Sequence, residues 1–355
     1  MERKIKYSFQ PGPAQLFPEV EIWTKFALKE GLLSRYHRDA IWREIFREAQ
    51  EALVRYLGLP EGWTVAFANS ATEIWQILVD ATATFRSLHF IQGAFAQRWY
   101  AFQRAANPYA EAMVLAFDQP YQAQVWRAAE KAPAPEYIAL VHVETSVGAY
   151  LPDIGEVRRV FPEALIAADA TSSLGGLSLP WHFIDIAFAS VQKCLGLPPG
   201  LGVLIVSPAA KRRFMHMPRY RYNALSFILQ SAEKHEPIHT PNLLGIFLLS
   251  RILQMRLPVS ETEGDLRARA FRLYSEIEKK GFIPLVPLLY RAPTVLAFKV
   301  ESSEVMYELR RRAEHAGLYL GWGYGAYKEE SFRVANFPAL PEESYGMLLE
   351  VLDMG

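Results

Sequence analysis

The sequence predicts an α/β fold: a large domain with a mostly parallel sheet covered by helices, followed by a smaller α+β domain. Over roughly residues 15–250, short apolar runs typical of buried strands alternate with helical patterns, which favours such a sheet. The 355 residues are enough for two domains with sizeable cores. From residue 257 on, the alternation gives way to a charged, helix-rich stretch. We therefore expect a large domain at 15–256 and a small C-terminal domain at 257–355.

The elements of the large domain follow in order from the spacing of their apolar residues. Residues 41–57 carry apolar side chains at helical spacing, which predicts a first helix. The predicted strands are then 64–69, 87–92, 112–117, 137–144, 164–169, 185–191 and 202–208. Predicted helices separate them at 72–84, at 96–106, near 120–131 and near 153–160.

The C-terminal part is predicted to mix helices with short apolar runs. Its elements are a helix-rich stretch at 261–281, an apolar run at 294–300, an amphipathic helix at 303–316, an apolar run at 332–337 and a final helix near 341–353. At the other end of the chain, Pro11 and Pro13 favour an extended backbone. We expect residues 1–14 to pack near the active site and the small domain.

Composition limits the classes of partner. The 38 basic residues balance 38 acidic ones, so no overall field attracts nucleic acid or an anionic membrane. Cys194 is the single cysteine, which excludes an internal disulfide and a cysteine-based zinc site, and we assign no metal site. The longest apolar run, 242–253, is too short to span a bilayer and carries Arg251. Residues 1–13 lack the apolar stretch of a signal peptide, so we expect a cytoplasmic protein.

Polar residues follow four of the predicted strands, at the edge of the sheet where ligands collect in α/β folds. These strand ends are 69–72, 144–146, 169–173 and 190–193. The last of them brings Lys193 into the nearly chargeless segment ASVQKCLGLPPG. Taken alone, such a lysine is more often a surface charge or an ion-pair partner. Together, the four strand ends favour a binding site.

Lys193 and Asp169 suggest a cofactor. Burial lowers the pKa of a lysine and makes its amine a usable nucleophile and base. A buried aspartate needs a cationic partner to stay ionised. Pyridoxal 5′-phosphate (PLP) joins the two, because its aldehyde condenses with a lysine amine and its pyridine nitrogen pairs with a carboxylate.

The segment 169–208 resembles the cofactor-binding core of the class V aminotransferases, which belong to the fold type I PLP enzymes. Further segments resemble the phosphoserine aminotransferases of that family, in the same order: 9–20, 36–45, 142–150, 239–247 and 331–338. The resemblance covers almost the entire chain. It implies a fold type I PLP-dependent transferase with a seven-stranded sheet. It also implies amino transfer between O-phospho-L-serine and 2-oxoglutarate, yielding 3-phosphohydroxypyruvate and glutamate, in serine biosynthesis.

The resemblance assigns roles around the cofactor ring. Lys193 matches the lysine that forms the imine with PLP and moves the substrate proton, and Asp169 matches the partner of the pyridine nitrogen. Thr145 matches the residue that hydrogen-bonds the ring hydroxyl. Phe95 lies where the family stacks an aromatic ring on the pyridine, with ordinary core packing as the alternative. Ser172 is either a support for Asp169 or a turn residue.

The cofactor phosphate has a candidate cradle where a strand ends and a helix begins, since free N–H groups and the helix dipole attract anions there. The cradle residues are Ser70, Ala71 and Thr72. Simple N-capping is the alternative, and both can hold in the same turn. The resemblance adds Gln192. It also adds His239 and Thr240 from a second subunit, although the family more often has asparagine where His239 stands.

The substrate has two sets of candidate partners. Arg333 matches the family's carboxylate-binding arginine, and a solvated strand arginine is the alternative. His37 and Arg38 match the pair that holds the substrate phosphate across the subunit boundary, which implies a homodimer with shared sites. The chain departs from the family shortly before Arg333, where a second His-Arg pair is replaced and Lys328 is the candidate cation.

Other functions remain to be weighed. A serine– or alanine–glyoxylate aminotransferase shares the lysine loop and the carboxylate arginine, and a PLP-binding homologue without catalysis is a remote alternative. A cysteine desulfurase is disfavoured because Cys194 adjoins the lysine and no other cysteine exists. A dinucleotide-binding dehydrogenase is disfavoured because no GxGxxG joins a strand to a helix.

Overall fold

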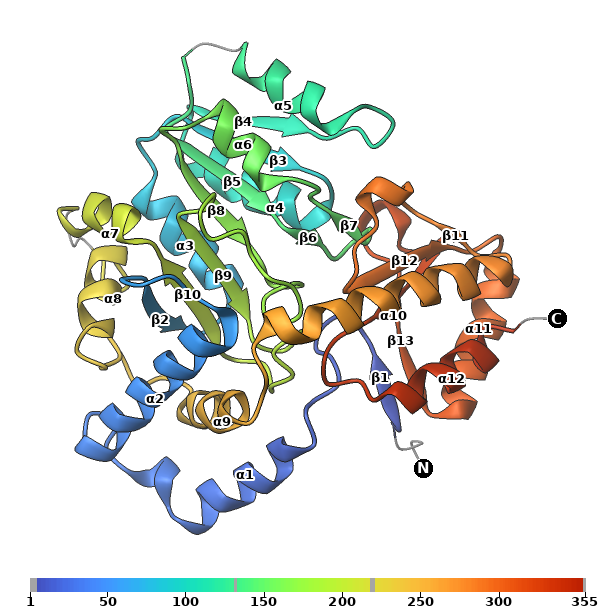
Figure 1. Ribbon diagram of the computed structural model, residues 1–355, viewed down its shortest axis with the longest axis horizontal. Helices are drawn as coiled ribbons and strands as arrows, with labels where there is room; N and C mark the ends of the chain where they lie inside the picture. Colours follow the sequence, from blue (N-terminus) through green and yellow to red (C-terminus); the bar gives the residue numbers. More distant parts are fainter. Residues whose placement is uncertain (1–4, 131–132, 218–220, 354–355) are drawn as a thin grey trace.

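The computed structural model describes residues 5–130, 133–217 and 221–353. In this part of the chain, seven strands form one sheet in the order β2-β10-β9-β8-β5-β3-β4 (Figure 1). The strands are β2 (Thr64–Ala68), β3 (Ser87–Ile91), β4 (Ala110–Val114), β5 (Tyr137–Val141), β8 (Leu165–Asp169), β9 (Ile186–Ser190) and β10 (Gly202–Val206). The strands share one direction except for β10, which runs antiparallel to β2 on one side and to β9 on the other. The predicted α/β class with a mostly parallel sheet is therefore confirmed.

Helices cover both faces of this sheet because its strands bury side chains alternately on the two sides. In β5, Ile138 and Leu140 join one apolar cluster, and Tyr137 and Ala139 join the other. The first cluster includes α2 (Ala40–Leu57), α5 (Tyr121–Ala129), α6 (Ile154–Val160) and α9 (Leu243–Gln254), with α1 (Glu19–Lys29) against α9. The second includes α3 (Ala71–Ala81), α4 (Ala94–Ala106), α7 (Pro208–Met215) and α8 (Leu225–Ala232).

A second sheet lies beside the first, to the right in Figure 1, and its five described strands have the order β1-β13-β14-β12-β11. They are β1 (Tyr7–Phe9), β11 (Ile283–Pro284), β12 (Val295–Lys299), β13 (Leu318–Trp322) and β14 (Ser331–Ala335). The helices that share its apolar core are α10 (Val259–Lys279), α11 (Ser303–Ala316) and α12 (Glu342–Val351). Shorter elements are η1 (Leu32–Ser34), η2 (Leu288–Tyr290), η3 (Gly325–Tyr327), β6 (Val143–Glu144) and β7 (Ala149–Tyr150).

Residues 7–17, here called the N-terminal strap, connect the two sheets. Strand β1 pairs in parallel with β13 of the smaller sheet. Further along, the Ala14 N–H donates to the Gln192 carbonyl at 2.9 Å, which fixes the strap to the loop that carries Lys193. Residues 1–4 of the predicted N-terminal segment lie outside the described residues.

The turn between α9 and α10 contains Pro258, which precedes the first residue of α10. The predicted domain boundary falls at this turn, and the division into two domains stays a prediction. Among the described residues, no single helix is long and apolar enough to cross a membrane; α9 and α10 meet that test only as a pair bent by 88°.

Several boundaries differ from those predicted. The strand expected at 112–117 is β4 at Ala110–Val114, because pairing with β3 rather than hydropathy sets its ends. The helix expected at 72–84 begins one residue earlier, since the Ser70 hydroxyl accepts a bond from the Glu73 N–H and caps it.

Candidate active site

Lys193 follows β9 by three residues and is 7% exposed. Its Nζ donates to Thr145 Oγ1 at 2.7 Å and to Ser172 Oγ at 2.9 Å. Burial lowers the pKa of Lys193 to about 8, although the attraction of Asp169 and Glu144 opposes the shift. The chain thus holds an amine that is partly neutral near physiological pH.

Asp169 ends β8, the strand next to β9 in the sheet. Its Oδ1 accepts a bond from the Thr171 N–H at 2.9 Å, and its Oδ2 accepts one from Trp75 Nε1 at 2.9 Å. Burial raises the pKa of Asp169, and hydrogen bonds from the side chain and N–H of Thr171, the nearby charge of Lys193 and the bond from Trp75 act against that rise. The carboxylate is therefore held by donors on both oxygens.

Lys193 and Asp169 line a cavity of about 250 Å³. Most of the predicted site residues share its wall: Ala71, Thr72, Phe95, Thr145, Asp169, Ser172, Gln192, Lys193 and Arg333. Two buried amide oxygens of wall residues have no hydrogen-bond partner within the described residues: Gln10 Oε1 and Gln192 Oε1. Because buried polar groups are normally paired, these two acceptor atoms indicate a polar ligand with hydrogen-bond donors, and they fit a cofactor that carries a hydroxyl group.

The N-terminus of α3 has fewer free N–H groups for an anion than predicted. Ser70 caps the helix and does not line the cavity, and the Ala71 N–H donates to Ser190 Oγ at 2.7 Å. Within the described residues, the Thr72 N–H keeps no partner. Ser70 thus acts as the predicted N-cap. Of the two cradle residues that line the same cavity as Gln192, Thr72 alone keeps an N–H that is free for an anion in the described part of the chain.

Arg333 reaches the same cavity from β14 of the smaller sheet and is 6% exposed. Its Nε and Nη2 donate to the Trp322 carbonyl at 3.0 and 2.6 Å, and its Nη1 donates to the Thr145 carbonyl at 3.1 Å. A guanidinium has five N–H donors, so one remains on each terminal nitrogen, as the two oxygens of a carboxylate require. Burial lowers the pKa of Arg333 to about 10, which leaves it cationic at neutral pH.

Aromatic rings form another part of the wall. Phe95 stacks on Tyr324 with ring centroids 5.0 Å apart and 14° between the planes, and Lys193 Nζ lies 5.4 Å from the Phe95 centroid. The fully buried Glu144 carboxylate fixes this end of α4 by accepting the N–H groups of Phe95 and Ala96. Tyr324 was not predicted, because it lies in a loop without a periodic pattern.

The N-terminal strap closes the cavity near the lysine. Gln10 to Pro13 line it, and a Cβ added to Gly12 would lie 2.8 Å from Lys193 Cε. With a φ of +139° as well, this position requires glycine. Ser172 contacts Lys193 and Thr145, whereas the support predicted for Asp169 comes from Thr171 and Trp75.

Besides Ser70, five predicted site residues lie outside this cavity of their own chain: His37, Arg38, His239, Thr240 and Lys328. The first four gather elsewhere, with Thr240 Oγ1 3.4 Å from His37 Nδ1 and Arg38 Nη2 3.4 Å from the Pro237 carbonyl. Burial and the charge of Arg38 lower the pKa of His37.

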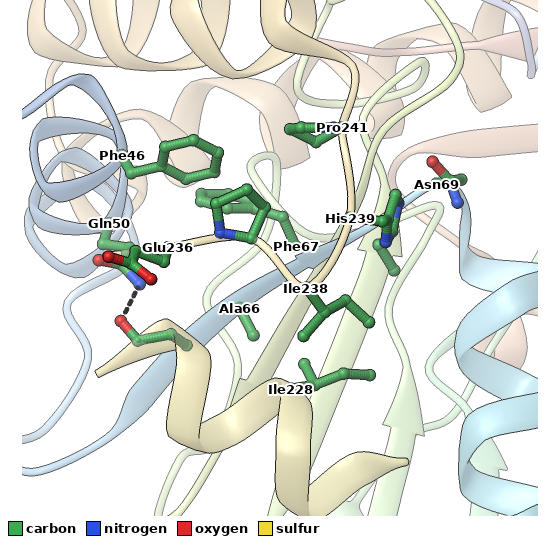
Figure 2. A pocket seen from close by; sticks show the side chains of 13 residues that line it. Phe46, Gln50, Ala66, Phe67, Asn69, Ile228, Glu236, Ile238, His239 and Pro241 are labelled. Carbon is green, nitrogen blue, oxygen red and sulfur yellow. Dashed lines mark hydrogen bonds between the residues drawn. The ribbon is translucent and has the colours of Figure 1, made fainter. Parts of the chain in front are cut away.

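Figure 2 shows His239 beside Asn69 at a separate, mostly apolar pocket. His37 Nε2 and His239 Nδ1 are buried without a partner among the described residues. Lys328 is exposed, and its Nζ lies 3.9 Å from Glu329 Oε1.

Comparison with known proteins gives consistent matches. Residues 7–310 match the family model described as aminotransferase class-V. The structure resembles that of a phosphoserine aminotransferase from Cytophaga hutchinsonii with a TM-score of 0.90 and 30% identity, over 99% of this chain and 100% of that chain. A phosphoserine aminotransferase from Rhodococcus jostii is 26% identical over 68% of this chain and 65% of that protein. An alanine–glyoxylate aminotransferase from Nostoc sp. shares the fold, with a TM-score of 0.83 and 20% identity over 99% of this chain and 96% of that chain.

Proposed function

Because the chain belongs to the class V aminotransferase family, we propose that it transfers an amino group between O-phospho-L-serine and 2-oxoglutarate, with PLP bound at Lys193. The observation that carries this proposal is one cavity that joins the buried amine of Lys193, the carboxylate of Asp169 and the guanidinium of Arg333. The products, 3-phosphohydroxypyruvate and glutamate, connect the reaction with serine biosynthesis.

PLP supplies an aldehyde that condenses with amines and a ring that takes up electrons when the substrate Cα loses its proton. The protein residues hold this group in place. Asp169 would keep a proton on the ring nitrogen, Thr145 would bond the ring hydroxyl, and Phe95 would pack on the ring. The Thr72 N–H and the side-chain amide nitrogen of Gln192 would donate to the phosphate, since both residues line the cavity.

Lys193 is the general base and acid for the proton on the substrate Cα. Its lowered pKa of about 8 supports this role, since the neutral amine accepts a proton and the ammonium returns it. The hydroxyls of Thr145 and Ser172 orient the amine. The two remaining N–H groups of Arg333 hold the substrate carboxylate and so fix which substrate face meets Lys193.

The substrate phosphate is bound by His37 and Arg38 of a second copy of the chain, and His239 and Thr240 of that copy approach the cofactor phosphate. The four residues cluster away from the cavity of their own chain, and two ring nitrogens there lack partners in the described part of the chain, which supports a shared site. The proposal therefore includes a homodimer with closed twofold symmetry.

A mixing experiment tests the shared site. Lys193→Ala protein and an Arg38→Ala/Thr240→Ala double variant should each be inactive alone. Mixed after mild dissociation, they should regain activity, because one site of each hybrid dimer has a full set of residues. Mixing either variant with itself is the control. A monomer with full activity, or no recovery in a verified hybrid, would exclude the shared site.

Substrate choice is tested with Arg38→Ala. A charge-assisted hydrogen bond contributes about 1.5–3 kcal/mol, so kcat/KM for phosphoserine should fall by a factor on the order of 10². A small neutral amino donor should be barely affected, because Arg333 still holds its carboxylate. Lys328→Ala is the matched control: this exposed lysine lies beside Glu329, and its loss should have a smaller effect in the same direction.

A second candidate function is amino transfer from serine or alanine to glyoxylate. It is favoured by the cavity of a single chain, where Lys193 and Arg333 are the only cations among the described lining residues. Initial rates with the two substrate pairs decide between the functions. Faster turnover of phosphoserine with 2-oxoglutarate supports the proposal, and faster turnover of serine or alanine with glyoxylate replaces it. If the protein binds PLP and turns over neither substrate pair, it is a PLP-binding homologue without catalysis.

A further inference from the structure

Trp75 contacts Asp169 directly, although no periodic pattern singled it out. It lies one turn into α3 on the helix face that packs against the sheet, is 3% exposed and lines the cavity. Its indole N–H donates to Asp169 Oδ2 at 2.9 Å. A buried indole needs an acceptor for its N–H, and here that acceptor is the carboxylate of the site.

The two bonds to Asp169 fix the plane of its carboxylate. The Thr171 N–H holds Oδ1 and comes from the same strand end, two residues on. The bond from Trp75 to Oδ2 comes from another element, so it ties strand β8 to helix α3. A carboxylate accepts about four hydrogen bonds, so both oxygens keep acceptor capacity for a ligand in the cavity.

The same bond changes the chemistry of the carboxylate. A donor that bonds the ionised form stabilises it over the protonated acid. Burial acts in the opposite direction on Asp169, which is 4% exposed. A less basic carboxylate leaves a shared proton on its partner instead of taking it. The bond from Trp75 therefore both orients the Asp169 carboxylate and favours its ionised form.

We propose that Trp75 is a positioning residue whose indole N–H keeps Asp169 ionised and aimed at the ring nitrogen of PLP. This inference rests on the proposed function, since it takes PLP as the ligand of the cavity. Trp75 acts through Asp169, and the proposed function gives it no role of its own.

Trp99 provides a matched control. It stacks on Trp75 with centroids 6.1 Å apart and planes 8° apart, and it is 1% exposed. Within the described residues, its indole nitrogen has no hydrogen-bond partner. Replacing either tryptophan with phenylalanine removes the same atoms from the same stacked pair, but only Trp75→Phe removes a bond to Asp169.

The experiment measures the dissociation constant of PLP for cofactor-free protein by equilibrium dialysis from pH 6 to 9. Trp75→Phe should weaken binding about tenfold or more at pH 7, as expected for a bond to a charged group. Trp99→Phe should change it less than about twofold. In an Asp169→Asn background, Trp75→Phe should have almost no further effect, because the carboxylate through which it acts is gone.

The pH profile separates this role from packing. Without the indole donor, the pKa of Asp169 rises further, so Trp75→Phe protein should lose PLP affinity at a higher pH than wild type on the acid side. Trp99→Phe protein should keep the wild-type profile. A second variant with 3-benzothienylalanine at position 75 preserves the ring shape without the N–H, and it replaces Trp75→Phe if that variant does not fold.

The outcomes are distinct. Equal weakening by Trp75→Phe and Trp99→Phe, or undiminished weakening by Trp75→Phe in the Asp169→Asn background, would overturn the positioning role alone. Wild-type protein that fails to bind PLP would overturn the proposed function and this inference with it. Selective, Asp169-dependent weakening with a shifted acid limb supports the inference.

Discussion

The cavity around Lys193 has two walls that are built differently. On the lysine wall, formed by Lys193, Asp169, Thr145 and Ser172, reactive side chains bond to other side chains. On the arginine wall, formed by Arg333 and Tyr324, the functional side chain bonds to main-chain carbonyls. The first wall stands on the seven-stranded sheet, and the second stands on the five-stranded sheet.

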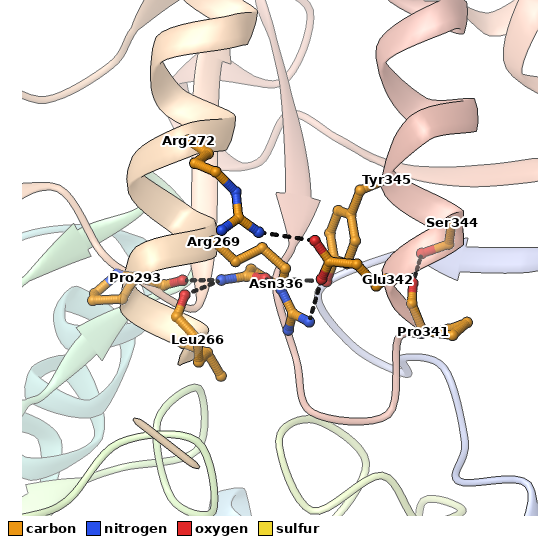
Figure 3. A network of polar contacts seen from close by, with 9 residues as sticks. All are labelled: Leu266, Arg269, Arg272, Pro293, Asn336, Pro341, Glu342, Ser344 and Tyr345. Atoms are coloured by element: carbon orange, nitrogen blue, oxygen red, sulfur yellow. Dashed lines mark hydrogen bonds and ion pairs between the residues drawn. The ribbon is translucent and has the colours of Figure 1, made fainter. Parts of the chain in front are cut away.

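Behind the arginine wall, one buried amide fixes the end of strand β14 (Figure 3). Asn336 Nδ2 donates to the carbonyls of Leu266 and Pro293 at 3.0 and 2.8 Å. Its Oδ1 accepts bonds from Arg269 Nε at 2.6 Å and Tyr345 Oη at 3.0 Å. The amide therefore joins β14 to α10 and α12, three residues after Arg333.

The difference between the two walls shows two ways in which a functional side chain is held in position. The lysine wall is positioned group by group, so a change there alters the chemistry of the site. The arginine wall is positioned by holding a whole strand, so remote residues can alter binding without touching a ligand. Four predictions test this contrast, from the largest expected effect to the smallest.

Lys193→Ala should lower kcat by a factor on the order of 10³ or more, because it removes the proton shuttle and the attachment point of PLP. Steady-state rates of glutamate formation measure this loss, and far-ultraviolet circular dichroism checks the fold. Borohydride reduction of PLP-loaded wild-type protein, followed by peptide mapping, should place the label on Lys193. A label on another lysine would contradict the assignment.

Lys193→Met should stabilise the cofactor-free protein at pH 7 by up to about 3 kcal/mol. The reason is the lowered pKa of Lys193, about 8 against an ordinary 10.5. Below pH 8 the Lys193 amine of the folded protein is protonated, so the folded protein carries the full cost of a buried ammonium. Between pH 8 and pH 10.5 the unfolded chain binds more protons than the folded protein. Wild-type stability therefore rises with pH there, and the advantage of the variant should vanish above about pH 10.5.

Denaturant unfolding of both proteins at pH 7, 9 and 10.5 measures this advantage. A variant that is less stable than wild type at every pH would show that the bonds of Lys193 to Thr145 and Ser172 outweigh the cost of its charge.

Arg333→Lys should raise KM for the amino donor by about 10- to 50-fold with a smaller change in kcat, because an ammonium cannot form two parallel bonds to a carboxylate. Steady-state kinetics with phosphoserine and 2-oxoglutarate give both constants. A 10- to 50-fold fall in kcat with unchanged KM would contradict this expectation and show that Arg333 affects the chemical step, as the lysine wall does.

Asn336→Ala should lower the free energy of unfolding by about 2 kcal/mol, since it leaves buried partners unpaired. It should also raise KM a few-fold while kcat stays nearly constant, because the Arg333 strand loses its anchor. Ser344→Ala removes a bond to the Pro341 carbonyl in the same network, without touching Asn336, and serves as control. An equal rise in KM for Ser344→Ala would contradict the role of Asn336 as the anchor of the Arg333 strand.

The sequence predicted the lysine wall better than the arginine wall, for a physical reason. Lys193 and Asp169 follow two apolar runs, and the carboxyl ends of parallel strands meet at one edge of a sheet. Their neighbourhood thus follows from the strand pattern alone. Arg333 came only from the family resemblance, because nothing in the local pattern says which sheet its strand joins.

The unpredicted features depend on tertiary contacts. Trp75 meets Asp169 through the rotation of α3 on the sheet, and the one available signal was an indole on a face that must be buried. Tyr324 reaches Phe95 from a loop. Strand β13 contains Gly321, which weakens its β pattern, and it pairs with β1 and β14 from distant parts of the sequence. Strand β10 was predicted, but an apolar run does not encode its antiparallel direction.

The N-terminal strap has a consequence for biosynthesis. Tyr7 pairs with Leu318, so β1 must wait for a partner strand that is synthesised roughly 310 residues later. At about 5–20 residues per second, this delay is on the order of 15–60 s. During that time the seven-stranded sheet is already complete once Val206 has emerged, and the strap can be held only by its bonds to the Lys193 loop, such as that from the Ala14 N–H to the Gln192 carbonyl. The pairing of β1 with β13 is therefore a late step of folding, and in a nascent chain stalled before residue 318 the strap should lack its anchor on the smaller sheet.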